Sequence, residues 1–195
     1  NALYDLYNSI NSGNYSLAYA NQILINKSGE VIGKFLNKSS GLKGNLFPNL
    51  LKQFEIPIVA SIFKKEEMLK MNLNFDESIH GSEEYCLYMQ MAALSDIIAS
   101  EKFVVKYRLH NSLSFNLGKR TFMERNYTLS KILNRNPELR TKYKYEFNVA
   151  YARSDYYKAQ FLMKKNQNLK AFKLLVPYVF LDFKYLFLTF LSLLP

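Results

Sequence analysis

The chain changes character at Leu117, and this change constrains its fold more than any other feature of the sequence. Up to that point, short strand-like runs alternate with helical runs. The runs are, in order, "YSLAYA", the hairpin pattern "NQILINKSGEVIGKF", the buried-strand pattern "IPIVASIF", the helical "KKEEMLKMN", a helix over 82–95, and the β-rich "DIIAS" and "KFVVKYRL". A mixed order of this kind predicts an α/β domain over residues 1–117, with helices flanking a mixed sheet.

Beyond this point the strand-like runs stop. Residues 119–136 and 138–165 have the spacing of helices, with Pro137 between them. The stretch "AYARSDYYKAQFLMKKNQNLKAFKLL" resembles one helix-turn-helix unit of the tetratricopeptide type, with "KKNQN" as its turn and the small Ala171 where the helices meet. A solenoid needs about three such repeats and we find no second copy. We therefore expect an all-helical extension over residues 118–195.

Composition excludes several classes of protein. Hydrophobic residues make up 49% of the 195, so the chain can bury a core and is not a disordered tail. The single Cys86 excludes a disulfide framework, and the two histidines, His80 and His110, are too few for a Cys/His zinc cluster. A reduced, cytoplasmic setting is therefore expected. The chain begins with Asn-Ala and shows no signal segment, so we expect it to be a fragment.

The formal net charge of +10 is concentrated late in the chain. Residues 1–100 hold 8 Lys and Arg against 10 Asp and Glu, whereas residues 101–173 hold 17 against 5. A basic region of this kind favours nucleic acid or an anionic membrane surface as its partner. RNA-binding domains usually carry aromatic residues on a sheet or a recognisable motif. Because the sequence has neither, we predict no nucleic-acid partner.

The final stretch, residues 174–195, reads "LLVPYVFLDFKYLFLTFLSLLP" and is rich in Leu, Phe and Tyr. A helix that spans a membrane needs about 20 apolar residues, but Pro177, Asp182 and Lys184 interrupt this one. Aromatic residues with a few charges are typical of a helix that lies in the membrane interface. We therefore predict peripheral attachment to a membrane surface through residues 174–195. The alternative is a terminal helix that packs on its own domain or on another part of the protein.

Two adjacent carboxylates, Glu83 and Glu84, stand at the start of the helix expected over 82–95. Acidic residues in a first helical turn interact favourably with the helix dipole, by about 0.3–1 kcal/mol each, and this role alone explains many such pairs. The helix itself is apolar on both sides, which indicates that it is buried and that its N-terminus opens into a crevice. A carboxylate in a crevice is a candidate general base.

A second group of polar residues, "YRLHNSLS" at 107–114, follows the last β-rich run. Arg108 and His110 are spaced two apart, so on a strand they share one face, and Ser112 and Ser114 extend that face if the strand continues. A guanidinium, an imidazole and two hydroxyls suit a diphosphate, with a metal ion on the imidazole. The alternative is an exposed strand edge with ordinary polar residues.

In this order the pieces resemble the second half of a bacterial family 2 glycosyltransferase of the GT-A fold, over residues 15–116. "YANQILINKSGEVIGK" is similar to the family's Tyr-x-Asp strand and the hairpin after it, with Asn21 where Asp is usual. "IPIVASIFKKEEMLKMNLNFDESIHGSEEYCLYMQMA" matches the segment that leads through Gly-Phe-Asp-Glu to Glu-Asp-Tyr-Asp-Leu. "YRLHNSLS" matches the Tyr-Arg-x-His-x-x-Ser-x-Ser that closes the catalytic domain.

The resemblance implies a partial GT-A-type mixed sheet and a sugar transfer, with inversion, from a nucleotide-diphosphate sugar to a hydroxyl of a glycan or lipid-linked acceptor. Glu84 takes the position of the acid that deprotonates the acceptor, and Glu83 precedes it. Arg108, His110 and Ser112 would contact the donor diphosphate. A Mg²⁺ or Mn²⁺ ion would neutralise that diphosphate, with His110 as one further ligand. Its main ligands, an Asp-x-Asp pair, would lie in a nucleotide-binding half upstream of this chain.

The resemblance also implies a role in cell-surface polysaccharide synthesis, at the inner face of the plasma membrane, where lipid-linked acceptors reside. The sequence departs from the family at Glu84, which replaces Asp, at Cys86, which replaces Asp, and at Gln90, which replaces Arg. Two alternatives therefore stay open: a degenerate transferase domain kept as a scaffold, and a non-catalytic module whose basic helices bind a partner. This fragment is expected to be inactive by itself.

Overall fold

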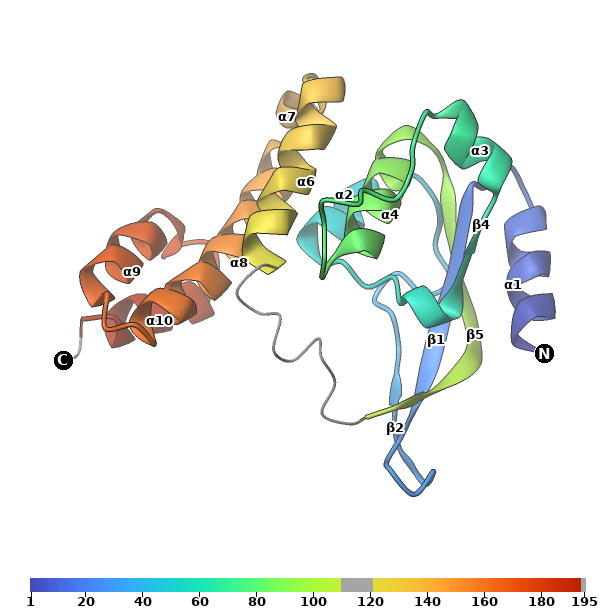
Figure 1. Ribbon diagram of the computed structural model, residues 1–195, viewed down its shortest axis with the longest axis horizontal. Coiled ribbons are helices and arrows are strands. Elements are labelled where there is room, and N and C mark those ends of the chain that lie inside the picture. The colour runs from blue at the N-terminus through green and yellow to red at the C-terminus, as the bar shows by residue number, and fades with distance from the viewer. Residues whose placement is uncertain (110–120, 194–195) are drawn as a thin grey trace. The chain divides into compact units, whose positions relative to one another are not determined.

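The computed structural model describes residues 1–109 and 121–193 (Figure 1). The chain divides into two compact units, Asn1–Ser112 and Leu113–Pro195. The first unit combines a mixed sheet with helices, which confirms the predicted α/β class.

Two long strands, β1 (Leu17–Ile25) and β5 (Ile97–Arg108), run parallel through the sheet of the first unit. The short strand β4 (Ser61–Phe63) pairs antiparallel with the first part of β1, and β2 (Val31–Phe35) pairs antiparallel with its last part. On the far side, β3 (Lys43–Gly44) pairs antiparallel with β5. β1 therefore lies between neighbouring strands over most of its length, and its residues 17–22 are all buried.

Each long strand joins two runs that the sequence analysis kept apart. "YSLAYA" and the first arm of the hairpin form β1, while "DIIAS" and "KFVVKYRL" form β5. The exposed Glu101 and Lys102 separate two apolar runs and so conceal the continuity of β5. At this point β5 advances four residues, from Ala99 to Phe103, while β1 advances two, from Tyr19 to Asn21. Extra residues of this kind are accommodated as bulges, which bend a strand, and Figure 1 shows β5 strongly curved.

The predicted buried strand "IPIVASIF" is wrong in its first half. Only Ser61–Phe63 is a strand, whereas Ile58–Ala60 forms the 3₁₀ turn η1. Pro57 has no backbone N–H to donate to a sheet, and the Ala60 N–H donates to its carbonyl at 3.0 Å, which closes the turn. The side chains of Ile58 and Val59 are 54% and 53% exposed as a result.

Four helices accompany the sheet: α1 (Ala2–Asn11), α2 (Phe47–Lys52), α3 (Lys65–Lys70) and α4 (Glu83–Leu94). The sequence analysis had assigned no helix to residues 2–11, where α1 buries Leu6 and Ile10 on one face. α1 lies on one side of the sheet, and α2 and α4 lie on the other (Figure 1). In α4 the eight residues 85–92 are all buried, which confirms that this helix belongs to the core.

The second unit, over its described residues 121–193, contains helices and no strand. These are α6 (Thr121–Arg135), α7 (Leu139–Lys142), α8 (Lys144–Met163), α9 (Asn168–Leu175), the 3₁₀ turn η3 (Val176–Tyr178) and α10 (Phe183–Leu191). The single helix expected over 138–165 is interrupted at Tyr143, which separates α7 from α8.

The predicted turn at "KKNQN" is confirmed, and its backbone explains why α8 stops there. Asn166 has a φ of 56°, in the left-handed region that ends many helices. The Gln167 N–H then donates back to the Leu162 carbonyl at 2.9 Å. Ala171 is fully buried with Ala159 and a third alanine of α8, as expected of small residues where two helices touch. Within the described ranges, no helix is long and apolar enough to cross a membrane.

Candidate functional site

Glu83 and Glu84 form the first turn of α4, as the sequence predicted. Ser82 precedes them as the N-cap residue, but its side chain makes no capping hydrogen bond. Both glutamates are half-buried, whereas every residue from Tyr85 to Ala92 is in the core. The two carboxylates therefore lie in the first turn of α4, and the helix is held in place because its next eight residues are buried in the core.

A tyrosine and a serine lie beside Glu84. The Tyr88 hydroxyl, one turn along α4, is 3.0 Å from the Ser61 Oγ of β4. Burial raises the pKa of Tyr88, the hydrogen bond with Ser61 lowers it in part, and the negative charge of Glu84 raises it further. Glu84 is thus within electrostatic reach of the Tyr88 hydroxyl, whose part-buried contact with Ser61 joins α4 to β4.

Cys86 and Gln90, two of the departures from the family pattern, interact with each other inside the core. Gln90 Nε2 donates to the Cys86 carbonyl at 2.9 Å and lies 3.4 Å from its Sγ. Cys86 is 1% exposed, so it is a small core residue. The Gln90 NH₂ group therefore finds its acceptor within one turn of α4, which explains how this group is accommodated there.

Arg108 lies at the end of β5 and contacts the hairpin between β1 and β2. Its Nη1 donates to the carbonyls of Asn26 at 3.0 Å and Lys27 at 2.6 Å. The guanidinium is exposed, and its Nε and Nη2 make no hydrogen bond to any residue that the structure describes. His110 and Ser112, the other two predicted diphosphate contacts, lie outside the described residues.

Metal binding stays a prediction. Among residues 1–109 and 121–193, no group of three His, Cys, Asp or Glu side chains is close enough to hold an ion. His110, the suggested further ligand, is not among them. The described residues therefore offer no site to which the Mg²⁺ or Mn²⁺ implied by the resemblance can be assigned.

A buried carboxylate that the sequence analysis missed accepts three hydrogen bonds in the first unit. Glu55 is 6% exposed, and its Oε2 and Oε1 accept hydrogen bonds from the backbone N–H groups of Lys38 at 2.6 Å and Ser39 at 2.7 Å. The Tyr19 hydroxyl donates to Oε1 at 3.4 Å. Burial first of all, and then the adjacent negative charge, raises the pKa of Tyr19 well above its usual range.

Asn21 holds the same loop from the other side. Its Oδ1 accepts from the Asn37 N–H at 2.9 Å, and its Nδ2 donates to the Ser40 Oγ at 3.0 Å and the Glu101 carbonyl at 2.8 Å. An aspartate at this position could not donate to that carbonyl. The departure from the Tyr-x-Asp pattern at Asn21 thus has a local structural reason.

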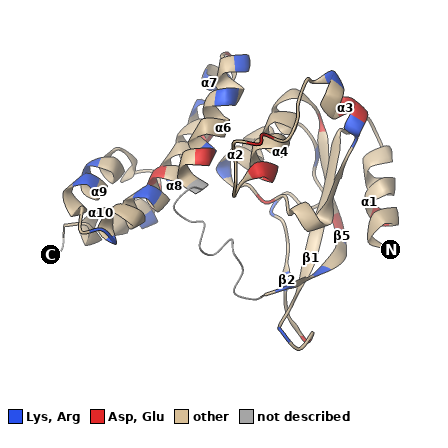
Figure 2. Ribbon diagram, in the orientation of Figure 1, with Lys and Arg blue, Asp and Glu red and all other residues tan. Residues whose placement is uncertain are grey.

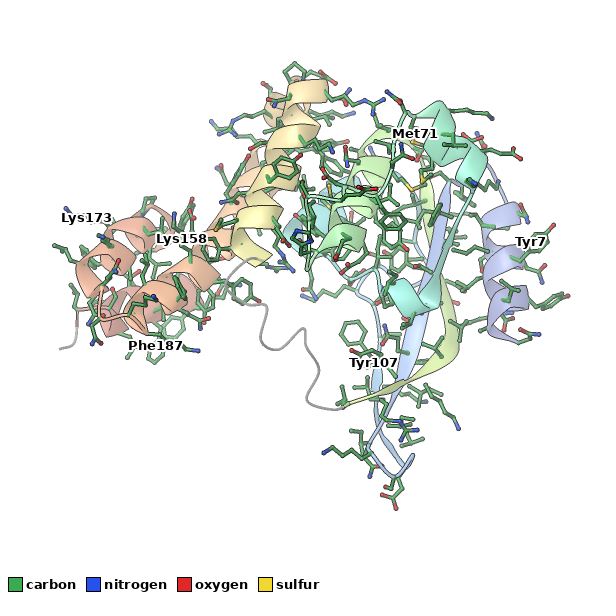
Figure 3. All side chains as sticks on the ribbon, viewed as in Figure 1. Tyr7, Met71, Tyr107, Lys158, Lys173 and Phe187 are labelled. Carbon is green, nitrogen blue, oxygen red and sulfur yellow. The ribbon has the colours of Figure 1, made fainter. Side chains whose placement is uncertain are left out.

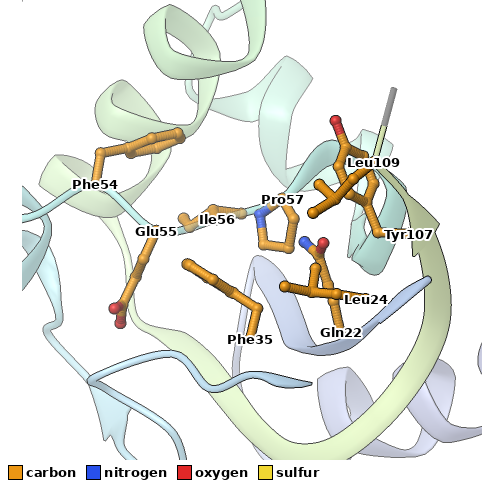
Figure 4. Close-up of a pocket in the computed structure, with 9 residues that line it drawn as sticks. All are labelled: Gln22, Leu24, Phe35, Phe54, Glu55, Ile56, Pro57, Tyr107 and Leu109. Atoms are coloured by element: carbon orange, nitrogen blue, oxygen red, sulfur yellow. The ribbon is translucent and has the colours of Figure 1, made fainter. Parts of the chain in front are cut away.

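An apolar pocket of about 330 Å³ lies on the sheet beside this network (Figure 4). β1, β2, the end of β5 and the loop before η1 supply its lining. The lining residues are Gln22, Leu24, Phe35, Phe54, Glu55, Ile56, Pro57, Tyr107 and Leu109. The ring of Phe54 also packs edge-on against Tyr85, the residue after Glu84, at 4.9 Å between centroids. The pocket therefore adjoins the first turn of α4.

Comparison with known proteins does not assign this chain to a family. No protein family matches the chain, and neither the curated proteins nor the solved structures contain a match.

Proposed function

We propose that the first unit is the acceptor-side part of a glycosyltransferase similar to family 2. It would act in cell-surface polysaccharide synthesis, on a nucleotide-diphosphate sugar donor and a hydroxyl of a glycan or lipid-linked acceptor. The observation that carries the proposal is the position of Glu84: a half-buried carboxylate in the first turn of a helix whose next eight residues are in the core. Catalytic groups need this kind of rigid support, because they must be held within a fraction of an ångström of the productive geometry.

In the proposed reaction, Glu84 accepts the proton of the acceptor hydroxyl while that oxygen attacks the anomeric carbon of the donor. The new glycosidic bond forms as the bond from the anomeric carbon to the diphosphate oxygen breaks, and the diphosphate leaves with the electron pair. Attack from the opposite face inverts the configuration. Arg108 supports the departure of this anion, since it offers guanidinium N–H groups beyond the two hairpin contacts.

The test uses the natural full-length polypeptide in a sugar-transfer assay with a panel of donors and acceptors. Glu84→Gln keeps the size of the side chain but removes its ability to accept a proton, so turnover should fall by roughly 10²-fold or more. Glu83→Gln is the matched control and should cost less. If both variants only lower the melting temperature slightly and Glu84→Gln turns over like the parent, the carboxylates act as a helix cap and the proposal fails.

The second unit suggests where the enzyme works. The boundary at Leu113 assigns 11 Lys and Arg and 11 Asp and Glu to the first unit, against 15 and 5 in the second, so the formal charge of +10 belongs to the second. Figure 2 shows these basic residues distributed over α6, α8 and α9. We propose that this unit binds the anionic inner surface of the plasma membrane, where charge of this sign is attracted.

The face of α10 gives this attachment an apolar component. Phe183, Phe187 and Phe190 share one side of the helix and are 77%, 56% and 62% exposed, while Tyr185 and Leu188 on the other side are buried against α8 and α9. Phe187 points away from the other helices (Figure 3). Exposed phenylalanines on a basic unit are typical of surfaces that insert at the boundary of headgroups and acyl chains.

A further inference from the structure

The apolar pocket of the first unit contains the amide of Gln22, which has no hydrogen-bond partner among the described residues. Gln22 is 6% exposed, yet its side-chain amide makes no hydrogen bond to any residue that the structure describes. Its carboxamide points into the pocket, toward Pro57 and Leu109 (Figure 4). The amide is accessible from the open pocket, so it is available to a ligand that can pair with its N–H and carbonyl sides.

Among the described residues that line the pocket, Glu55 is the only charged one, and it does not present its charge to the pocket. Both oxygens of Glu55 accept backbone N–H groups of the loop at residues 38–39. Figure 4 shows this carboxylate directed away from the pocket, so that only the apolar part of the side chain contributes to the wall. A ligand of this pocket should therefore be neutral, because a charged one would lose its hydration without gaining a partner.

The remaining walls specify the shape of the ligand group. The rings of Phe35, Phe54 and Tyr107, together with Pro57 and Leu24, line the open pocket around the amide. A carboxamide offers one N–H donor side and one carbonyl acceptor side, and both are satisfied at once by a second amide in head-to-tail pairing. An acetamido group has this amide and adds a methyl group that suits aromatic and aliphatic walls. A plain sugar ring, by contrast, would bury hydroxyl groups against carbon.

We propose that the pocket binds the acetamido group of an N-acetylated sugar, and the choice of a sugar rests on the proposed transferase function. The Gln22 amide pairs with the ligand amide, and the methyl group lies against Phe35 and Pro57. Through Phe54, which contacts Tyr85, the pocket is adjacent to the turn that carries Glu84. The site thus selects an acceptor whose N-acetylated ring is held next to the proposed base.

Saturation-transfer NMR on the chain, with N-acetylglucosamine and glucose as probes, tests the proposal without requiring turnover. N-acetylglucosamine should bind, its acetamido methyl protons should receive the strongest saturation, and glucose should bind at least severalfold more weakly. Gln22→Leu removes both hydrogen bonds and should weaken binding on the order of tenfold. Gln53→Leu is the matched control, since Gln53 precedes the pocket-lining residues without belonging to them, and it should bind like the parent.

A melting curve keeps the result interpretable. Gln22→Leu replaces an unpaired buried amide by a side chain of similar size, so the melting temperature should be unchanged or higher, and lost binding then reports the site itself. Equal binding of the two sugars, no saturation of the acetamido methyl group, or unchanged binding by Gln22→Leu would each overturn the proposal. Selective binding together with an active Glu84→Gln enzyme would instead refute the transferase mechanism and leave the pocket assignment intact.

Discussion

The substitution Glu55→Gln tests how much the buried carboxylate contributes to holding the loop at residues 38–39. Glu55 accepts the Lys38 and Ser39 N–H groups on different oxygens, at 2.6 and 2.7 Å. Glutamine preserves one oxygen but turns an NH₂ group toward the other N–H, so one backbone donor loses its acceptor and meets another donor. A hydrogen bond to a charged acceptor contributes about 1.5–3 kcal/mol, and a buried donor left unpaired costs about 1–3 kcal/mol. We expect the free energy of unfolding of the first unit to fall by about 2–4 kcal/mol.

The assay has to report the first unit separately, because a chain of two units need not unfold in one step. Amide hydrogen exchange gives this resolution: protection at Lys38 and Ser39 should decrease strongly in the variant, and protection in α4 should decrease only by the global loss. Urea unfolding followed by circular dichroism supplies the free energy. Glu77→Gln is the matched control, since Glu77 is exposed in a loop, and its effect should stay within about 0.5 kcal/mol.

Two results would contradict this role of Glu55. If Glu55→Gln loses less than about 1 kcal/mol and the two amides exchange as slowly as in the parent, the carboxylate does not hold the loop. A loss of several kcal/mol with no change at Lys38 and Ser39 would also contradict it, because the cost would then come from elsewhere in the core.

Two further predictions concern the second unit. Phe187→Ser combined with Phe190→Ser removes side chains that are 56% and 62% exposed. This double substitution should weaken binding to anionic vesicles by about 2–3 kcal/mol, or roughly thirtyfold or more. Equal sedimentation of this variant, the parent and the α1 control Tyr4→Ser with the vesicles would reject the membrane face. Burial raises the pKa of the Asp155 carboxyl above its ordinary 3.8, although the hydrogen bond from Tyr178 at 2.9 Å lowers it in part. Because the pKa is raised in the folded state, this carboxyl favours folding below about pH 3.8, and its contribution is lost as the pH rises. The stability of the parent relative to Asp155→Asn should therefore decline from about pH 3.5 to 7. An increase in this relative stability over the same range, measured by urea titrations, would show that the sign is wrong.

The sequence was informative wherever side-chain pattern decides local structure. The unbroken apolar run after Glu84 predicted that α4 is buried, and all eight residues from Tyr85 to Ala92 are in the core. The turn before α9 followed equally well from "KKNQN". Strand boundaries were less predictable, because exposed Glu101 and Lys102 mark no end of β5 when the neighbouring β1 continues to pair across them. Here the pairing partner, not the local pattern, decides where the strand ends.

The residues around the pocket could not be predicted from the sequence, for a different reason. Three successive backbone N–H groups, those of Asn37, Lys38 and Ser39, converge on acceptors supplied by Asn21 and Glu55. Successive N–H groups of this kind form an anion-binding concavity in many proteins, but they belong to the backbone and leave no mark in a sequence. In "QFEIP", Glu55 looks like any acid of a surface loop. Its partners are 16 and 17 residues away, so only the fold reveals that its carboxylate is bound to the loop and that the neighbouring pocket contains the neutral amide of Gln22.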